Sequence, residues 1–241
     1  MPDGYLFLDG SATRIFLEEN ENIPDGDELG TILRINEETG DYWFAIFSYD
    51  DSGYVDSSDR DSLDADALMR SMREGARYAN EERRKRGWTP LELEGWHQPP
   101  FFNPTTSNLT WTTRLSSDGE PVINHSVRLL GRSGIMRAQL VADVGAFDAT
   151  TLEFDDLLRS YSFNPGQRYA EFRSGDKLAG YGLTALIAGG AGAAAVKTGV
   201  LQKAWKFIVF GFIALVGAVR KLFGGRGQQS EPAEPAEPTS V

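Results

Sequence analysis

One long segment near the C-terminus limits what this chain can fold into. Residues 178–223 contain no acidic side chain, although the whole chain of 241 residues carries a net charge of −11. Residues 178–196 form an uncharged run, and residues 207–219 form a second, more hydrophobic run. A helix needs roughly 20 residues to cross the hydrocarbon core of a bilayer. The pattern therefore predicts a membrane anchor of two helices, at about 178–200 and 204–223.

Three arrangements of this segment are compatible with the sequence. The favoured one is a transmembrane helical hairpin, the second is one span followed by an interfacial helix, and the third is a buried Gly/Ala-rich helix of a water-soluble domain. The third is disfavoured because a helix on a soluble domain shows a polar face and neither run has one. Ala185, Gly189 and Ala193 recur at four-residue spacing, which lets helix backbones approach closely. They are the candidates for helix–helix self-association.

The lipid bilayer is thus the expected partner. Aromatic and basic residues at the ends of a span stabilise it at the membrane surface. The residues expected to anchor the chain are Tyr181, Gly189, Trp205, Lys206, Phe210, Phe212, Arg220 and Lys221. Three basic residues lie in the connector and three lie beyond the second run, so the distribution of positive charge leaves the topology open.

The rest of the chain divides into an acidic domain at 1–166, a juxtamembrane linker at 167–177 and a tail at 224–241. The tail contains the low-complexity repeat EPAEPAEP and is expected to be disordered. A strongly acidic domain argues against nucleic acid as a partner. The chain has no cysteine, so it forms neither disulfides nor thiolate metal sites, and no motif indicates a cofactor.

Alternation of apolar residues and turn signals predicts an α+β fold. We expect an antiparallel sheet of about six to eight strands, flanked by two helices and followed by the membrane hairpin. The expected strands lie at 4–9, 13–19, 29–35, 42–47, 91–96, 108–117 and 121–143, with a proline-rich corner at 97–104. The expected helices lie at 63–86, with Asp61 or Ser62 as N-cap, and at 147–162, where Leu152, Leu157, Leu158 and Tyr161 are the candidate packing residues.

Three polar features have structural explanations. The acidic stretch 50–66 lacks the ligand spacing of a calcium loop, so no metal site is predicted there. The basic cluster 83–86 ends the first helix before Gly87, as the helix dipole and a glycine cap favour. His125 shares one strand face with Ile123 and Val127, which indicates a core histidine.

Three hypotheses about function follow. One of them is a soluble regulator with a reversible amphipathic tail, which high salt or carbonate washing would extract from membranes. The favoured one is an interaction or structural domain, whose possible binding surface consists of the aromatic residues Tyr54, Trp96, Phe101 and Phe102. The alternative is a hydrolase tethered to the membrane that uses the carboxylates Asp50, Asp51 and Asp56. Convergence of two of these carboxylates in a pocket, with a displaced pKa, would favour the enzyme. Scattered, solvated carboxylates would favour the binding domain.

Ordered motifs along most of the chain resemble one family. They include Pro2-Asp3-Gly4-Tyr5, 50–55, Asn80-Glu81-Glu82-Arg83, Gly95-Trp96, Val127 to Arg132, Gly175-Asp176-Lys177 and 180–186. The chain is similar to the bacterial membrane-anchored proteins grouped as domain of unknown function 2167. The resemblance implies a membrane protein without an assigned activity.

Two features of this family bear on location and fold. Its members usually begin upstream with an export signal, which implies an inner-membrane protein whose soluble domain is periplasmic. No signal peptide precedes Pro2 here, which taken alone indicates a cytoplasmic domain. The order of strands, long helix, strands and closing helix is also similar to domains related to the photosystem protein PsbP.

Overall fold

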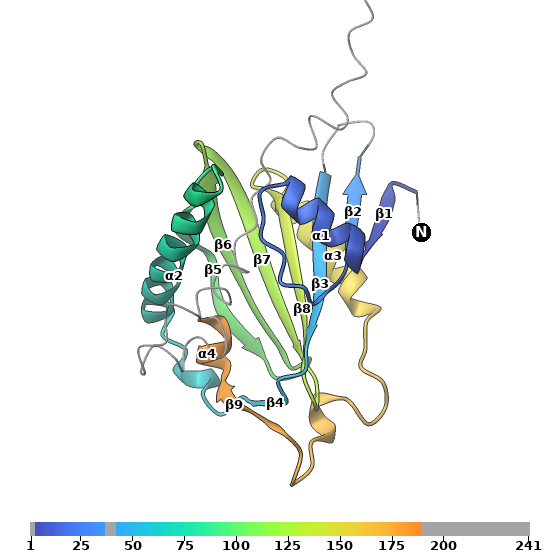
Figure 1. Ribbon diagram of the computed structural model, residues 1–241. Coiled ribbons are helices and arrows are strands. Elements are labelled where there is room, and N and C mark those ends of the chain that lie inside the picture. Colours follow the sequence, from blue (N-terminus) through green and yellow to red (C-terminus); the bar gives the residue numbers. More distant parts are fainter. Residues whose placement is uncertain (1–2, 37–41, 189–241) are drawn as a thin grey trace, which may run out of the picture.

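The computed structural model describes residues 3–36 and 42–188, and within them the main feature is a seven-stranded antiparallel sheet (Figure 1). The strand order is β1-β2-β3-β8-β7-β6-β5. The strands are β1 (Tyr5–Asp9), β2 (Glu28–Ile35), β3 (Tyr42–Asp50), β5 (Glu92–Asn103), β6 (Asn108–Ser117), β7 (Glu120–Leu130) and β8 (Ile135–Asp143). The predicted α+β class, with a large antiparallel sheet, is confirmed.

Four helices and a second, small sheet complete the described part. The helices are α1 (Gly10–Glu19), α2 (Ala65–Lys85), α3 (Phe147–Arg159) and α4 (Leu183–Ile187), and 3-10 turns lie at Arg60–Ser62 and Tyr169–Glu171. The small sheet pairs β4 (Tyr54–Asp56) with β9 (Leu178–Gly182) in parallel. Helices α2 and α3 match the two expected helices closely in their bounds.

The helices and the hairpin differ in detail from the predicted elements. Residues 13–19, expected as a strand, belong to α1, because the Asp9 carboxylate accepts a hydrogen bond from the Ala12 amide (2.8 Å) and caps a helix that buries Thr13 and Leu17 at four-residue spacing. The N-cap of α2 is Asp64, not Asp61 or Ser62. On α3 the packing residues are Phe147, Phe154 and Leu158, whereas Leu152 is exposed.

Two strand predictions also need correction. The single strand expected at 121–143 is the hairpin β7–β8, which turns where the Gly131 amide donates to the Gly134 carbonyl (2.8 Å). The corner expected at 97–104 is mostly part of β5, because register shifts against β6 let the chain pass Pro99 and Pro100 without leaving the sheet.

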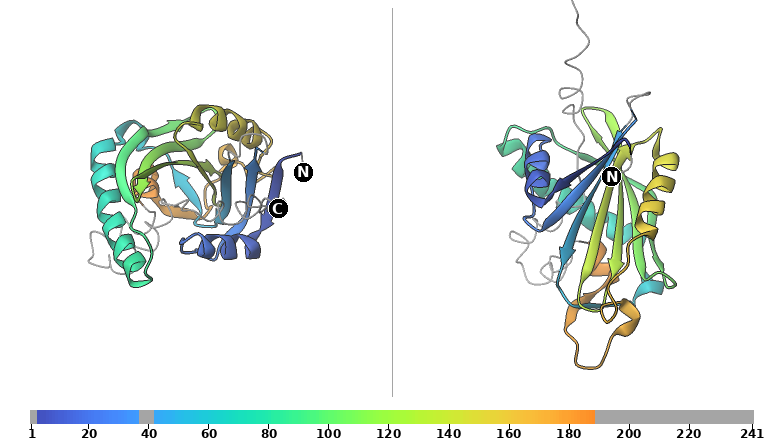
Figure 2. Two further views of the ribbon diagram at one scale, coloured as in Figure 1. Left: turned by 90° about the horizontal axis from the view of Figure 1, so that it is seen from above. Right: turned by 90° about the vertical axis from the view of Figure 1, so that its right-hand side faces the viewer.

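The sheet has helices on both faces (Figure 2), and it separates two hydrophobic clusters. Helices α1, α2 and α4 cover one face, and we call the cluster there the inner cluster. Helix α3 covers the other face. The inner cluster is centred on Phe44, Leu109, Trp111, Leu115, Ile135 and Val141, and the α3 cluster on Trp43, Val127, Leu140, Phe154 and Leu158.

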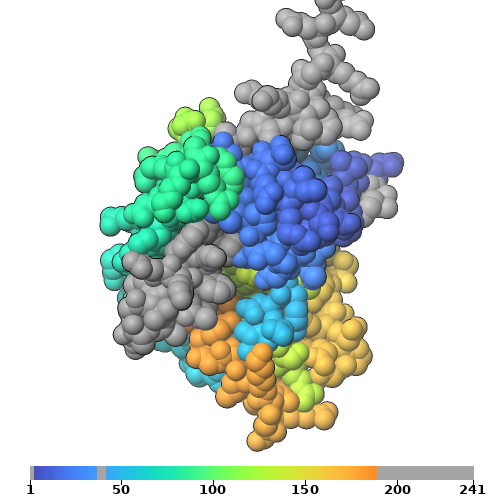
Figure 3. Space-filling view, in the orientation of Figure 1, coloured from blue at the N-terminus to red at the C-terminus, as the bar shows by residue number. Residues whose placement is uncertain are grey.

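The start of the predicted membrane helix is part of this domain. Residues 178–182 form β9, and Leu183, Leu186 and Ile187 of α4 are buried in the inner cluster. The predicted linker at 167–177 is also fixed to the sheet by Arg132, which follows β7. The Arg132 side chain forms an ion pair with Asp176 (2.7 Å), and the backbone amide of Arg132 donates to the Gln167 carbonyl (2.9 Å). Figure 3 shows β4 and β9 side by side at the lower end of the molecule. The folded domain therefore continues to Ala188.

The rest of the predicted anchor and the predicted tail lie outside the described residues. Within 3–36 and 42–188, no helix combines the length and the hydrophobicity that crossing a membrane requires. The self-association residue Ala185 is half-buried on α4, while Gly189 and Ala193 lie beyond the described part.

Candidate functional site

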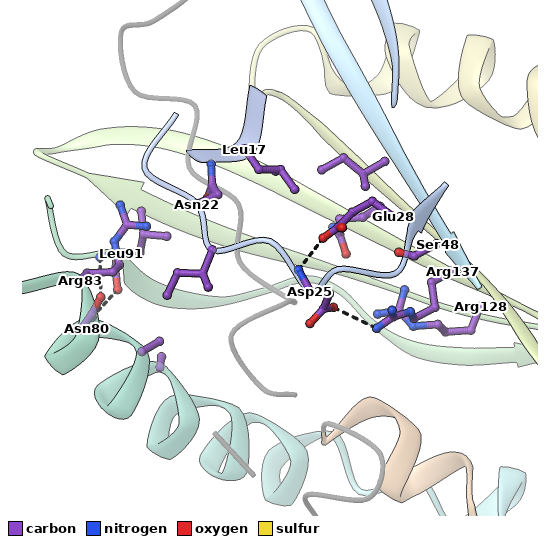
Figure 4. A pocket seen from close by; sticks show the side chains of 15 residues that line it. Leu17, Asn22, Asp25, Glu28, Ser48, Asn80, Arg83, Leu91, Arg128 and Arg137 are labelled. Atoms are coloured by element: carbon purple, nitrogen blue, oxygen red, sulfur yellow. Dashed lines mark hydrogen bonds and ion pairs between the residues drawn. The ribbon is translucent and has the colours of Figure 1, made fainter. Parts of the chain in front are cut away.

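A pocket lies between the inner face of the sheet, the loop that follows α1, and α2 (Figure 4). Its cavity has a volume of about 60 Å³. Apolar lining comes from Leu17, Ile23, Ile46, Ala76, Ala79 and Leu91, and polar lining from Asn22, Asp25, Glu28, Ser48, Asn80, Arg83, Arg128, Arg137 and Gln139. Nine of the fifteen lining residues are thus polar or charged, although most of the lining surface is apolar.

The polar floor of the pocket comes from residues that alternate along the central strands. Because side chains alternate between the faces of a strand, Ser126 and Arg128 of β7 share the inner face with Arg137 and Gln139 of β8. The strand register places them in two rows across the sheet. One row is Leu109, Arg128, Arg137 and Ser48, and the other is Trp111, Ser126, Gln139 and Ile46.

The second row is joined by hydrogen bonds. The Ser126 hydroxyl donates to Oε1 of Gln139 (2.6 Å), and Nε2 of Gln139 donates to Oδ1 of Asn124 (3.3 Å). All three side chains are buried. These bonds fix the orientation of the Gln139 amide at the floor of the pocket.

The first row places two arginines directly opposite each other. Like charges in this position repel, so each requires a compensating interaction. Arg128 is 7% exposed, stacks its guanidinium 4.7 Å from the ring centroid of Trp111, and donates a long hydrogen bond to the Val127 carbonyl (3.5 Å). Burial, together with repulsion from Arg137, lowers the pKa of Arg128 to about 9.

Arg137 is compensated by the loop that follows α1. It forms ion pairs with Asp25 (3.4 Å) and with Asp27. Burial raises the pKa of Asp25 to about 8, against the lowering effect of Arg137, and burial also raises the pKa of Asp27. Nε of Arg137 is buried without a hydrogen-bond partner among the described residues.

The buried Glu28 carboxylate determines the conformation of that loop. It accepts hydrogen bonds from the amides of Asp25 and Gly26, and it lies 3.7 Å from the guanidinium of Arg14. Gly26 has a φ of +93°, a conformation that a residue with a Cβ rarely adopts. The loop therefore directs Asp25 toward Arg137, as Figure 4 shows.

Helix α2 forms the opposite wall of the pocket. Asn80 makes two hydrogen bonds with the backbone of Leu91, both of 2.8 Å. Arg83 is 3% exposed and donates to the carbonyls of Thr89 and Glu21. The basic end of α2 thus does more than interact with the helix dipole, because Arg83 ties the helix to both the loop that follows α1 and the connection that leads into β5.

The four aromatic residues expected to form a binding surface do not meet at one site. Tyr54 on β4 stacks on Tyr169 and Phe172, with ring centroids 4.5 and 4.1 Å apart. Trp96 on β5 donates to the Ala65 carbonyl (3.0 Å) and packs against the inner cluster. Phe101 is exposed, but its neighbour Phe102 is a core residue, so Phe102 is a correction to the predicted surface.

The carboxylates of the hydrolase hypothesis lie outside the pocket lining. Asp50 is within 3.4 Å of the Tyr181 hydroxyl, and the Asp51 carbonyl accepts from the Lys177 ammonium. Asp56 is exposed, and hydrogen bonds from Ser58 lower its pKa. They do not meet the criterion of two carboxylates converging in a pocket.

The remaining predicted residues are placed as follows. His125 is buried, as predicted, with its Nδ1 2.8 Å from the Thr112 hydroxyl, and burial lowers its pKa to about 4. Tyr181 lies on β9 in the described domain, so its assignment to a membrane helix was wrong. Gly189, Trp205, Lys206, Phe210, Phe212, Arg220 and Lys221 lie outside the described residues. In 3–36 and 42–188, no three His, Asp or Glu side chains cluster as metal ligands would.

The sequence did not single out the pocket. In the sequence of the two strands β7 and β8, the polar residues Ser126, Arg128, Arg137 and Gln139 have the alternating spacing of a solvent-facing strand face. One signal was available in the sequence, because the alternating polar residues occur in two consecutive strands. In the centre of a sheet that helices cover on both faces, such polar residues must be buried.

The chain belongs to the protein family of unknown function DUF2167, whose sequence profile matches residues 1–220. No curated protein matches it. One similar solved structure is the solution structure of cyanobacterial PsbP from Synechocystis sp. PCC 6803, with 13% identity, a TM-score of 0.39, and coverage of 68% of this chain and 84% of that chain.

A second similar solved structure is a protein of unknown function from Pseudomonas aeruginosa, with 12% identity and a TM-score of 0.29. The alignment covers 52% of this chain and 74% of that chain. At these TM-scores neither likeness supports an argument about function, and the resemblance to PsbP-related domains stays a prediction.

Proposed function

We propose that this protein is a binding domain of the bacterial envelope, and that its inner pocket holds a small ligand. The observation that carries the proposal is the pair Arg128 and Arg137 at the floor of the pocket. Arg128 is buried and forms no ion pair with a described residue. A buried charge without a well-placed partner destabilises a fold, so its presence is explained best by a ligand that interacts with it. Interaction rather than catalysis is supported by the scattered positions of Asp50, Asp51 and Asp56.

We further propose that the segment following Ala188 attaches this domain to the inner membrane. Support comes from the uncharged run at 207–219 and its basic flanks Lys206 and Arg220. The short parallel pair β4–β9 holds Leu178–Gly182, which precede that segment, against the domain. The family's usual export signal supports a periplasmic location for the domain.

Retention of a ligand is tested by native mass spectrometry of the full-length protein purified without denaturation. We expect an added mass that disappears on denaturation. Ala79→Leu fills the pocket wall and is expected to abolish the added mass, whereas Arg77→Leu, on the exposed side of α2, is the matched control and is expected to keep it. A protein that carries no added mass in any preparation contradicts the binding function.

Membrane attachment and topology are tested by cysteine labelling, because the chain has no native cysteine. Thr105→Cys lies in the exposed β5–β6 turn, and Ser230→Cys lies in the C-terminal tail. A membrane-impermeant maleimide is applied to intact bacterial spheroplasts that produce the protein with its native upstream sequence. Labelling at both positions indicates the hairpin, and labelling at Thr105→Cys alone indicates one span. Labelling at Thr105→Cys only after lysis would show that the domain is cytoplasmic.

A further inference from the structure

The charges around the pocket floor do not balance within the described residues. Arg137 has two carboxylate partners, Asp25 and Asp27, but no ion pair of Arg128 with a described residue is present. Glu28 is occupied by the loop amides and by Arg14. Arg128 is therefore a buried cation that contacts a tryptophan ring and makes one long hydrogen bond, while the charges of Asp25 and Asp50 act on it without forming an ion pair.

The surroundings of Arg128 indicate which charge would compensate it. Its neighbour across the strand pair, Arg137, has a buried Nε without a hydrogen-bond partner in the described part of the chain. A planar guanidinium binds a carboxylate or phosphate through two parallel hydrogen bonds. Because Asp25, Asp27 and Glu28 line or adjoin the same space, a ligand with two negative charges would be repelled. A ligand with a single negative charge compensates Arg128 and is repelled less by these carboxylates.

The walls of the pocket indicate the rest of the ligand. Leu17, Ile46 and Leu91 present apolar side chains, and Ala76 and Ala79 leave room beside them. A cavity of about 60 Å³ holds only a few water-sized groups. Such a cavity fits a short aliphatic body of a few carbons better than a sugar or a nucleotide.

We propose that the pocket binds a small monocarboxylate, with its carboxylate between Arg128 and Arg137 and its apolar part against Leu17, Ile46 and Leu91. The Ser48 hydroxyl and the Gln139 amide lie on the same floor and complete the polar end of the site. This assignment rests on the proposed function that the domain binds a ligand in this pocket. It adds the chemical class of that ligand.

The test measures binding of short-chain carboxylates to the full-length protein by calorimetry and by thermal shift. The probes are acetate, butyrate, hexanoate and benzoate, with butyramide and butanol as uncharged analogues and inorganic phosphate as a competing anion. We expect one or more carboxylates to bind and to raise the melting temperature, while the uncharged analogues and phosphate do not.

Two substitutions locate the binding. Arg128→Met keeps a long apolar side chain against Trp111 and removes the charge, and we expect it to weaken carboxylate binding roughly 10- to 100-fold. Arg114→Gln removes an exposed arginine on β6 that pairs with Glu94, and it is expected to bind as the natural sequence does. Circular dichroism and the urea midpoint establish that each variant is folded. If Arg128→Met does not fold, Ala79→Leu, which obstructs the apolar part of the site, replaces it.

Three outcomes overturn the inference. They are the absence of binding by every carboxylate probe, equal binding by butyrate and butyramide, and binding that neither Arg128→Met nor Ala79→Leu changes. If native mass spectrometry nevertheless finds a retained molecule that lacks a carboxylate, the proposed binding function stands and only the ligand class is wrong. If no molecule is retained and no probe binds, both proposals fail.

Discussion

The two faces of the seven-stranded sheet are built from the same strands but in different ways. The face under α3 packs Trp43, Leu140 and Phe154 into an apolar cluster. The face under α1 and α2 also has an apolar cluster, but it interrupts that cluster with Arg128, Arg137 and their neighbours (Figures 2 and 4). One face stabilises the fold, and the other gives up part of that stabilisation to keep a charged pocket.

The comparison shows which face carries charged side chains that packing of the fold does not require. Replacing buried ion pairs with apolar residues of similar volume is often neutral or stabilising. A chain that needed only a sandwich of helices and sheet would pack both faces like the α3 face. The pocket face is therefore the one on which we propose ligand binding, and the stability effects of substitutions on the two faces should have opposite signs.

The largest expected effect is on the α3 face. Phe154 is fully buried, and its ring packs against Trp43 and His125. Phe154→Ala leaves a cavity there and is expected to lower the free energy of unfolding by about 3–5 kcal/mol. Urea unfolding of the full-length protein measures the change. Carboxylate affinity should not change if the variant is folded, and a parallel loss of affinity would show that the two faces are not independent.

The next effect has the opposite sign and lies on the pocket face. Arg128→Met removes a buried charge that forms no ion pair with a described residue, and it keeps contact with Trp111. We expect the free energy of unfolding without ligand to stay the same or to rise, by up to about 1–4 kcal/mol. The same urea experiment measures it. A loss of several kcal/mol would mean that Arg128 is a structural residue whose charge is already compensated.

How far the sequence predicts this molecule also differs between the two faces. Alternation along β7 correctly placed His125 with Ile123 and Val127, because a histidine among apolar residues is readily recognised as part of a core. The same alternation contained Ser126 and Arg128, but whether a polar face is solvated or buried depends on the helices that cover it. No local pattern in the sequence indicates that α1 and α2 cover these residues.

The C-terminal boundary shows a related limit. Hydropathy marks residues 178–196 as one uncharged run, and a continuous apolar run does not distinguish a membrane helix from a buried strand and helix. Pairing of β9 with β4 and burial of Leu183 are long-range contacts, so they resolve the first part of the run only in three dimensions. The capped start of α1 was missed although Asp9 was a readable N-cap signal.

The two faces should also respond differently to pH. On the α3 face, burial and a smaller contribution from His97 lower the pKa of His125 to about 4, below the ordinary value of 6.5. Between these values the unfolded chain binds the proton and the folded protein does not, so stability rises with pH from about 4 to 6.5. His125→Phe should reduce this slope. Urea midpoints across that range measure it, and an unchanged slope would contradict neutral burial of His125.

The last effect is expected on the pocket face and runs in the other direction. The pKa of Asp25 in the folded protein is about 8, above the ordinary value of 3.8. Between these values the folded protein holds a proton that the unfolded chain has released, so stability due to Asp25 is complete below about pH 4 and is lost as pH rises toward 8. Asp25→Asn imitates the protonated form and should flatten this decline.

The partners of Asp25 decide how the result is interpreted. The pKa of Asp27 is also raised, so Asp25→Asn should leave part of the dependence of stability on pH. The double variant Asp25→Asn/Asp27→Asn should remove that remaining part. An ionised Asp25 competes with a bound carboxylate for Arg137, so ligand affinity in the natural sequence should fall as pH rises through 8, and Asp25→Asn should weaken this dependence. Asp156→Asn, an exposed ion-pair partner on α3, is the control and should change neither property. If Asp25→Asn leaves the pH dependence of both stability and affinity unchanged, Asp25 is ionised over the whole pH range and pairs only with Arg137. The pocket then carries one more negative charge than a site for a monocarboxylate can accommodate.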